Sequence, residues 1–140
     1  MREILFRGKR LDNGEWVEGF YCCLKGGKYH YILTGMLDIT HGYPDLVKHA
    51  VDPATVGQFT GLLDKAGKRI FEGDIFDWGY SRVFDMRYTV SYDAEIASFF
   101  GAQKCGFLSL GGINIEVIGN IHDNPELLKE GDTDGKERTE

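Results

Sequence analysis

The residues in this sequence with the most obvious chemical potential are four carboxylates. Glu72, Asp74 and Asp77 lie close together along the chain, and Asp64 is nearby. Acid–base catalysis or cation binding would require such groups to converge at a fixed separation. Glycines interrupt the segment, so the simpler interpretation is that Asp74 hydrogen-bonds its own turn while Glu72 faces water. We favour this structural interpretation, because the spacing is not that of an EF-hand.

Histidines and cysteines are the next candidates for chemistry. The histidines are His30, His41, His49 and His122. No HExxH or HxH spacing joins them, so we expect neither a metal site nor a cofactor. Cys22 and Cys23 are adjacent and would point to opposite faces of a strand. A nucleophilic pair of Cys105 with His122 stays open, although no local motif supports it.

One stretch interleaves aromatic rings with arginines. It contains Trp78, Tyr80, Arg82 and Arg87. Such rings and guanidinium groups stack on nucleic-acid bases or anchor a protein interface. The same residues would also suit a loop that packs on a small sheet. These four residues are our candidate binding residues, and we assign no catalytic residue.

The N-terminal half has the pattern of a β-hairpin followed by further short elements. Residues 4–8 and 16–21 predict two strands, and Asn13-Gly14 between them favours a type I′ turn. Residues 29–33 predict a third strand. Glycines and Pro44 indicate a loop with short strand pieces over residues 34–50. Asp52 followed by Pro53 predicts one helical turn over residues 51–57.

The remaining part alternates turns with apolar strands. Gly67 and Gly73 mark two tight turns within residues 58–76. Strand signals follow at residues 87–92, 98–100, 106–110 and 113–121. Ile115 and Val117 share the buried face of the last strand, and Gly119 indicates a bulge. Residues 124–128 predict a short helix.

Composition defines the class of protein. Aromatic residues make up 13% and hydrophobic residues 42% of the 140 residues, which favours a strand-rich fold with its own core. The net charge of −6 lacks the strongly basic character of many nucleic-acid-binding domains. The charged N-terminus and the lack of a long apolar run favour a cytoplasmic protein without membrane contact. We therefore predict a mainly β fold, a small barrel-like or strongly bent antiparallel sheet, with SH3-like as one form, an N-terminal hairpin and one or two helical turns.

Four segments of the sequence resemble the YopX family of phage and prophage proteins. They are residues 1–8, 51–62, 64–75 and 115–128. In order and spacing they span nearly the whole chain, which predicts one domain over residues 1–129 and a disordered acidic tail over residues 130–140. The resemblance implies a β-dominated fold and a phage-related setting. It carries no reaction and no catalytic residues.

Three functions remain open from the sequence. The leading hypothesis is a non-enzymatic binding or assembly module that acts as a homo-oligomer or contacts a phage or host protein. The second is a nucleic-acid-associated small β-barrel protein that uses Trp78, Arg82 and Arg87. The third is a metal-assisted enzyme that uses Asp and His residues. We expect any functional surface to lie within residues 34–50 or 77–105.

Overall fold

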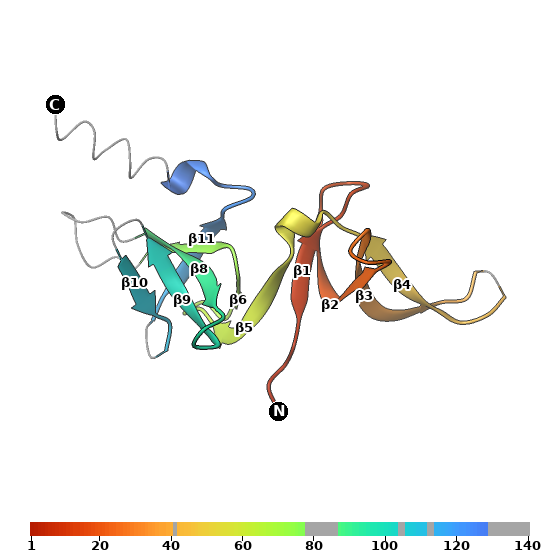
Figure 1. Ribbon diagram of the computed structural model, residues 1–140, viewed down its shortest axis with the longest axis horizontal. Coiled ribbons are helices and arrows are strands. Elements are labelled where there is room, and N and C mark those ends of the chain that lie inside the picture. Colours follow the sequence, from red (N-terminus) through yellow and green to blue (C-terminus); the bar gives the residue numbers. More distant parts are fainter. Residues whose placement is uncertain (41, 78–86, 104–105, 112–113, 129–140) are drawn as a thin grey trace. The chain divides into compact units, whose positions relative to one another are not determined.

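The computed structural model describes residues 1–40, 42–77, 87–103, 106–111 and 114–128. Contacts within the chain define two compact units, Met1–Gly61 and Leu62–Glu140. Each unit is β-rich and is described separately below (Figure 1). The single-domain boundary at residue 129 stays a prediction, and the tail over residues 130–140 lies outside the described residues.

The first unit is an antiparallel meander. Its strands are β1 (Phe6–Lys9), β2 (Trp16–Leu24), β3 (Tyr29–Asp38), β4 (Asp45–Ala50) and most of β5 (Gly57–Leu63), with the 3-10 turn η1 (Pro53–Thr55) before β5. The sheet has the order β4-β3-β2-β1-β5-β6, in which β5 runs on into the second unit. The predicted N-terminal hairpin is confirmed, because β1 and β2 pair antiparallel from Phe6 opposite Gly19 to Lys9 opposite Trp16.

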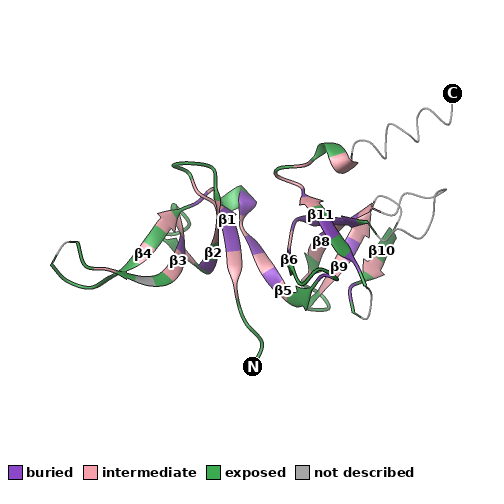
Figure 2. Ribbon diagram, turned by 180° about the vertical axis from the view of Figure 1, so that it is seen from behind, coloured by how far each residue is buried: buried purple, intermediate pink, exposed green. Residues whose placement is uncertain are grey.

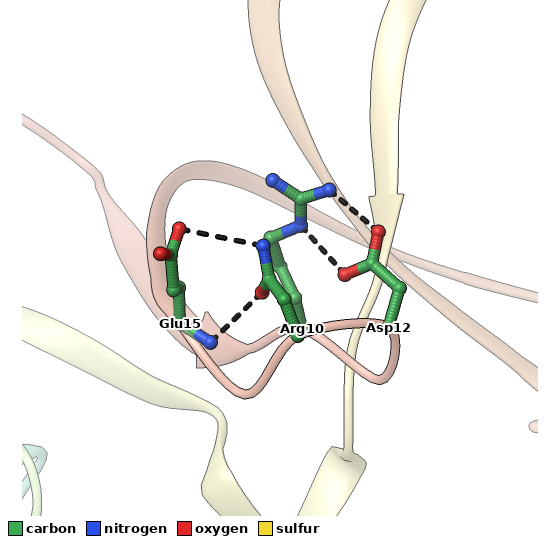
Figure 3. Close-up of polar contacts among 4 residues, drawn as sticks. Arg10, Asp12 and Glu15 are labelled. Carbon is green, nitrogen blue, oxygen red and sulfur yellow. Dashed lines mark hydrogen bonds and ion pairs between the residues drawn. The ribbon is translucent and has the colours of Figure 1, made fainter.

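The predicted type I′ turn of this hairpin is wrong. A type I′ turn needs positive φ at both central residues, but only Gly14 has it, at 71°. A longer loop is closed instead by the Arg10 N–H donating to the Glu15 carbonyl, and the Asn13 side chain accepts from the Glu15 N–H at 2.9 Å. The Arg10 guanidinium also donates two hydrogen bonds to the Asp12 carboxylate, from Nε to Oδ1 at 2.9 Å and from Nη2 to Oδ2 at 2.6 Å (Figure 3). These polar contacts favour the wider loop.

Residues 34–50 form more regular structure than the predicted loop. β3 continues to Asp38, and β4 pairs along it with a register shift between Leu33 and Leu37. The glycine here does not end the strand, since Gly35 with φ of 80° lies within the shift. Cross-strand pairing has therefore overridden the local turn signals.

The first sheet bends strongly. Val51, just after β4, forms an isolated bridge with Arg10, just after β1. Ile32 and Val51 are almost fully buried on the inner face. Gly19 is needed there, because a Cβ at this position would lie 2.1 Å from the Leu33 carbonyl oxygen. The predicted helical turn is present as η1, with the side chain of Asp52 accepting from the Ala54 N–H at 3.0 Å.

The second unit is built around a five-stranded antiparallel sheet. Its strands are β7 (Asp74–Asp77), β8 (Arg87–Asp93), β9 (Ser98–Gln103), β10 (Gly106–Ser109) and β11 (Glu116–Asn120), and the short β6 (Arg69–Phe71) precedes them. The order is β10-β9-β8-β7-β11, so the last strand in sequence lies beside the first. The core of this unit is a cluster of buried residues that consists of Ile70, Phe76, Tyr88, Val90, Leu110, Ile115 and Val117. Figure 2 colours the buried segments of the chain purple.

The segment after β11 covers part of the opposite face. Residues 126–128 are helical, which confirms the predicted short helix. A Cβ on Gly119 would lie 2.9 Å from Leu127 Cδ1, so glycine lets this segment pack closely on β11. The predicted bulge is also confirmed, since the pairing of β11 with β7 shifts between Val117 and Gly119.

The predicted fold class is therefore confirmed at the level of a mainly β protein with bent antiparallel sheets and few helical turns. Strand pairing among the described residues does not close either sheet into a barrel.

Candidate functional site

The carboxylate group singled out from the sequence shapes turns. Asp74 is 1% exposed, and its Oδ2 accepts the Phe71 N–H at 2.8 Å across the corner at Gly73. Asp64 Oδ1 accepts the N–H groups of Ala66 and Lys68 at 2.9 and 2.8 Å. These geometries agree with the structural interpretation, in which the carboxylates replace backbone acceptors in tight turns.

Asp64 also connects distant parts of the second unit. Its Oδ2 accepts the N–H of Val117, in β11, at 3.1 Å. Burial raises the pKa of Asp64, but the backbone donors of Lys68, Val117 and Ala66 outweigh burial, and the pKa lies below its ordinary value. The carboxylate is therefore held ionised as a structural acceptor, which is unsuited to a general acid at neutral pH.

His30 lies in a small polar cluster on the β2–β3 hairpin. The Tyr21 hydroxyl lies 2.5 Å from His30 Nδ1, and His30 Nε2 lies 2.8 Å from the Gly27 carbonyl oxygen. A carbonyl only accepts, so Nε2 carries the proton and Nδ1 accepts from the Tyr21 hydroxyl. Burial, and then the neighbouring Cys23, raise the pKa of the Tyr21 phenol. Both ring nitrogens of His30 are thus committed to structural hydrogen bonds.

Cys22 and Cys23 point to opposite faces of β2, as their adjacency predicted. Cys23 pairs with His30 and is exposed, whereas Cys22 pairs with Tyr31 and is half-buried. Cys105 lies outside the described residues, so a nucleophilic pair of Cys105 with His122 stays open. Among the residues that the structure describes, no three His, Cys, Asp or Glu side chains form a group able to hold a metal ion.

The predicted aromatic and arginine stretch is described only at its end. Trp78, Tyr80 and Arg82 lie outside the described residues. Arg87 begins β8, and its Nη1 donates to the Leu127 carbonyl at 2.6 Å. Arg87 therefore holds the C-terminal helical turn against the sheet, and the binding role assigned to the four residues stays a prediction.

An aromatic surface lies elsewhere, on the outer face of β9 and β10. Gly101 faces the core, because a Cβ there would lie 2.7 Å from Phe76 Cζ. Side chains alternate along a strand, so Phe100 points to the opposite face. Phe107 is opposite Ala102 and shares that outer face, where its ring meets Phe100 edge to face at 6.4 Å between centroids.

These rings border an open hollow of about 360 Å³. Its lining consists of Asp93, Ile96, Ser98, Phe99, Phe100, Phe107 and Ser109. Phe107 is 80% exposed and Ile96 is 68% exposed, although both are large apolar side chains. We name this surface the β9–β10 hollow. Its volume is at the small end of the ~300–1,000 Å³ typical of ligand pockets, which suits one or two apolar side chains.

Two further features define the chemistry of the β9–β10 hollow. β10 pairs with β9 only and is an edge of the sheet over the described residues. Asp93 ends β8 and lines the hollow, and Glu95 lies in the turn that follows, where Asp93 Oδ1 accepts the Glu95 N–H at 2.9 Å. The site therefore combines an apolar floor, a free strand edge and an acidic border. The sequence signal for it was weak, because Phe100 and Phe107 come together only through the pairing of β9 with β10.

Comparison with known proteins agrees with this β-rich architecture. Residues 5–129 match the family described as YopX protein, and the chain belongs to this family. The crystal structure of protein EF1440 from Enterococcus faecalis is similar, with a TM-score of 0.58 and 24% sequence identity, and the match covers 91% of this chain and 99% of that chain. At this identity the similarity concerns the fold alone. No curated protein matches the sequence.

No helix among the described residues is long and apolar enough to span a membrane.

Proposed function

We propose that the protein is a non-enzymatic binding module that holds an extended segment of a protein partner in the β9–β10 hollow. The observation that carries this proposal is the 80% exposure of Phe107 beside the edge of β10, which pairs with β9 alone within the described part of the chain. Exposed aromatic rings grouped around a hollow are typical of interaction sites. A strand edge offers backbone hydrogen bonds to an added strand, while the hollow accepts one of its side chains.

The charges near the hollow favour a particular kind of segment. Asp93 lines the hollow and Glu95 lies in the turn that follows Asp93, so the border is acidic. An acidic border attracts a segment in which Lys or Arg flanks an apolar residue, and it repels nucleic acid.

Membership of the YopX family adds the biological setting. The family resemblance implies a phage or prophage gene, so we expect the partner to be a phage or host protein in the bacterial cytoplasm. No reaction accompanies this proposal.

Binding of designed peptides tests the proposal. The probe is a fluorescein-labelled octapeptide that alternates Phe with Thr and carries Lys at both ends, and binding is measured by fluorescence anisotropy. The same peptide with terminal Glu tests the acidic border, and a peptide with central Pro residues tests strand addition. We expect the Lys peptide to bind more tightly than either of the other two.

Phe107→Ser is the matching protein variant. Burial of about 100 Å² of this ring at about 25 cal/mol/Å² gives about 2.5 kcal/mol, or roughly 60-fold in Kd. Tyr43→Ser removes another exposed ring, 63% exposed, from the first unit and is the control. Equal binding by the wild type and Phe107→Ser would refute the proposed site. A dimer in sedimentation experiments that Phe107→Ser converts to a monomer would instead assign the hollow to a second copy of the chain.

A further inference from the structure

The outer face of the first sheet carries a second set of aromatic residues, and these are accompanied by lysines. Trp16 and Phe20 lie on the same face of β2, because they are four positions apart and side chains alternate along a strand. Tyr31 is opposite Cys22 and Tyr29 is opposite Leu24, so both tyrosines share this face. The buried Ile32 belongs to the other, inner face. The aromatic residues therefore lie on the solvent side, where Phe20 is 60% exposed and Tyr29 is 38% exposed.

Cations accompany three of these rings. Lys9 Nζ lies 5.6 Å from the centroid of the Trp16 ring. Arg7 Cζ lies 4.7 Å from the same centroid, but Arg7 is buried, at 8% exposed. Lys48 Nζ lies 5.5 Å from the Tyr31 ring. Lys25 and Lys28, from the β2–β3 turn, lie 5.3 and 5.5 Å from the Tyr29 ring. We name this surface the cationic aromatic face.

Acidic residues are almost absent from this face, although the first unit carries as many acidic as basic residues. Glu18 is the exception, and it lies opposite Arg7. Asp12 is occupied by Arg10 in the loop between β1 and β2 (Figure 3). The other acidic residues lie away from this face. Glu3 precedes β1, and Glu15 lies in the loop between β1 and β2. Asp38 and Asp45 lie opposite one another at the far end of the β3–β4 pair, and Asp52 precedes η1. Charge is thus separated within a unit whose sum is close to zero.

We infer that the cationic aromatic face binds single-stranded nucleic acid. Unpaired bases stack on aromatic rings, and lysines neutralise the phosphates between them. The face runs across β1, β2, β3 and β4, which is about 14 Å at about 4.8 Å per strand and suits a short run of nucleotides. A long lysine side chain moves readily from ring to phosphate, which leaves the ring for a base. A duplex is excluded from this contact, because its bases are already stacked and paired.

Titration of labelled oligonucleotides with the full chain tests this inference. The probes are fluorescein-labelled dT15 and U15, with a 15-base-pair DNA duplex for comparison, and anisotropy is measured at 20, 50, 100 and 200 mM salt. We expect dT15 and U15 to bind more tightly than the duplex, with a Kd that weakens steeply as salt rises. The two single strands distinguish DNA from RNA as the source of the ligand.

Charge-matched variants locate the site. Lys28→Ala combined with Lys48→Ala removes two cations from the cationic aromatic face. Each phosphate contact contributes roughly eightfold at 50 mM salt, so we expect up to about 60-fold weaker binding and a salt slope smaller by about 1.4. Lys65→Ala combined with Lys68→Ala makes the same charge change at two exposed lysines of the second unit and should leave binding unchanged.

Stacking needs its own variant. Phe20→Ser removes an exposed ring without changing charge, and we expect about tenfold weaker binding of dT15. Absence of wild-type binding at 20 mM salt would overturn the inference. Equal losses of affinity in the two double-lysine variants would also overturn it, because they would indicate non-specific electrostatic attraction. Equal affinity for the duplex and the single strands would overturn it as well, because the bases of a duplex cannot stack on the rings.

Discussion

Replacing Asp64 by Asn measures how much one buried carboxylate stabilises the second unit. Asn retains an oxygen that can accept from Ala66 and Lys68, but its amide nitrogen would face the Val117 N–H. Val117 is 9% exposed, so its N–H would be left without an acceptor in a buried place. An unsatisfied buried donor costs about 1–3 kcal/mol, and we expect this loss for Asp64→Asn. Asp64→Ala removes all three bonds and should cost about 4.5 kcal/mol, at about 1.5 kcal/mol for each bond to a charged group.

Urea unfolding followed by circular dichroism measures the free energy of unfolding, and amide hydrogen exchange locates the effect. We expect the Val117 amide to lose protection in both variants. Asp38→Asn is the matched control, because Asp38 accepts the Thr40 N–H and hydroxyl in an exposed turn. The control should change stability by less than about 0.5 kcal/mol, as surface substitutions usually do.

The same carboxylate gives a prediction for pH. The pKa of Asp64 is lowered in the folded protein, so its contribution is fully present above the pKa of the unfolded chain, which is about 3.9. The contribution is lost as the pH falls through the lower, folded pKa. The difference in stability between wild type and Asp64→Asn should therefore be constant from about pH 5 to 7 and shrink below about pH 4.

Two results would refute this reasoning. One is an Asp64→Asn variant as stable as the wild type at pH 7, which would mean that the Val117 N–H finds another acceptor. The other is a stability difference that stays constant down to pH 2.5, which would mean that the charge of Asp64 is not what stabilises the turn.

Two other predictions follow from the first unit. Gly19→Ala places a Cβ 2.1 Å from the Leu33 carbonyl oxygen, so we expect the free energy of unfolding to fall by more than about 3 kcal/mol, as measured by thermal unfolding. Gly106→Ala is the control and should be tolerated, because nothing lies within 4 Å of a Cβ there. Similar melting temperatures for the two variants would contradict the packing argument. The Tyr21 phenol should ionise above the ordinary pKa of about 10, so Tyr21→Phe should remove part of the 295 nm absorbance that develops above that pH in an alkaline titration, and an unchanged titration there would contradict the raised pKa.

Local signals in the sequence predicted the turns and caps well. Asp52 and Pro53 indicated the η1 turn, Gly67 the left-handed turn position, and Gly119 the bulge, and all three are observed. These features depend on the conformational preferences of single residues, which act within a few positions. The structural interpretation of Asp74 was also accessible, because its hydrogen-bond partner is three residues away.

Most features that depend on pairing between distant strands could not be predicted, although the N-terminal hairpin could. Residues 34–50 looked like a loop, because the glycines are visible in the sequence but the partner strand β3 is not. The approach of Lys48 to Tyr31 follows from the register of β3 and β4, and that of Phe107 to Phe100 from the register of β9 and β10. Both candidate binding surfaces are therefore products of register. The sequence pattern indicated instead Trp78, Tyr80 and Arg82, which are neighbours along the chain.

The bond between Asp64 and Val117 has a consequence for biosynthesis. The two residues are 53 positions apart, and β7 likewise gains its second neighbour only when β11 is made. Until β11 emerges from the ribosome, the edge of β7 stays exposed and the Asp64 carboxylate lacks the Val117 N–H as a donor. The first unit, whose consecutive strands β1 to β4 are neighbours, can order much earlier. The second unit should thus be the slow step of folding and the part most in need of protection from aggregation during synthesis.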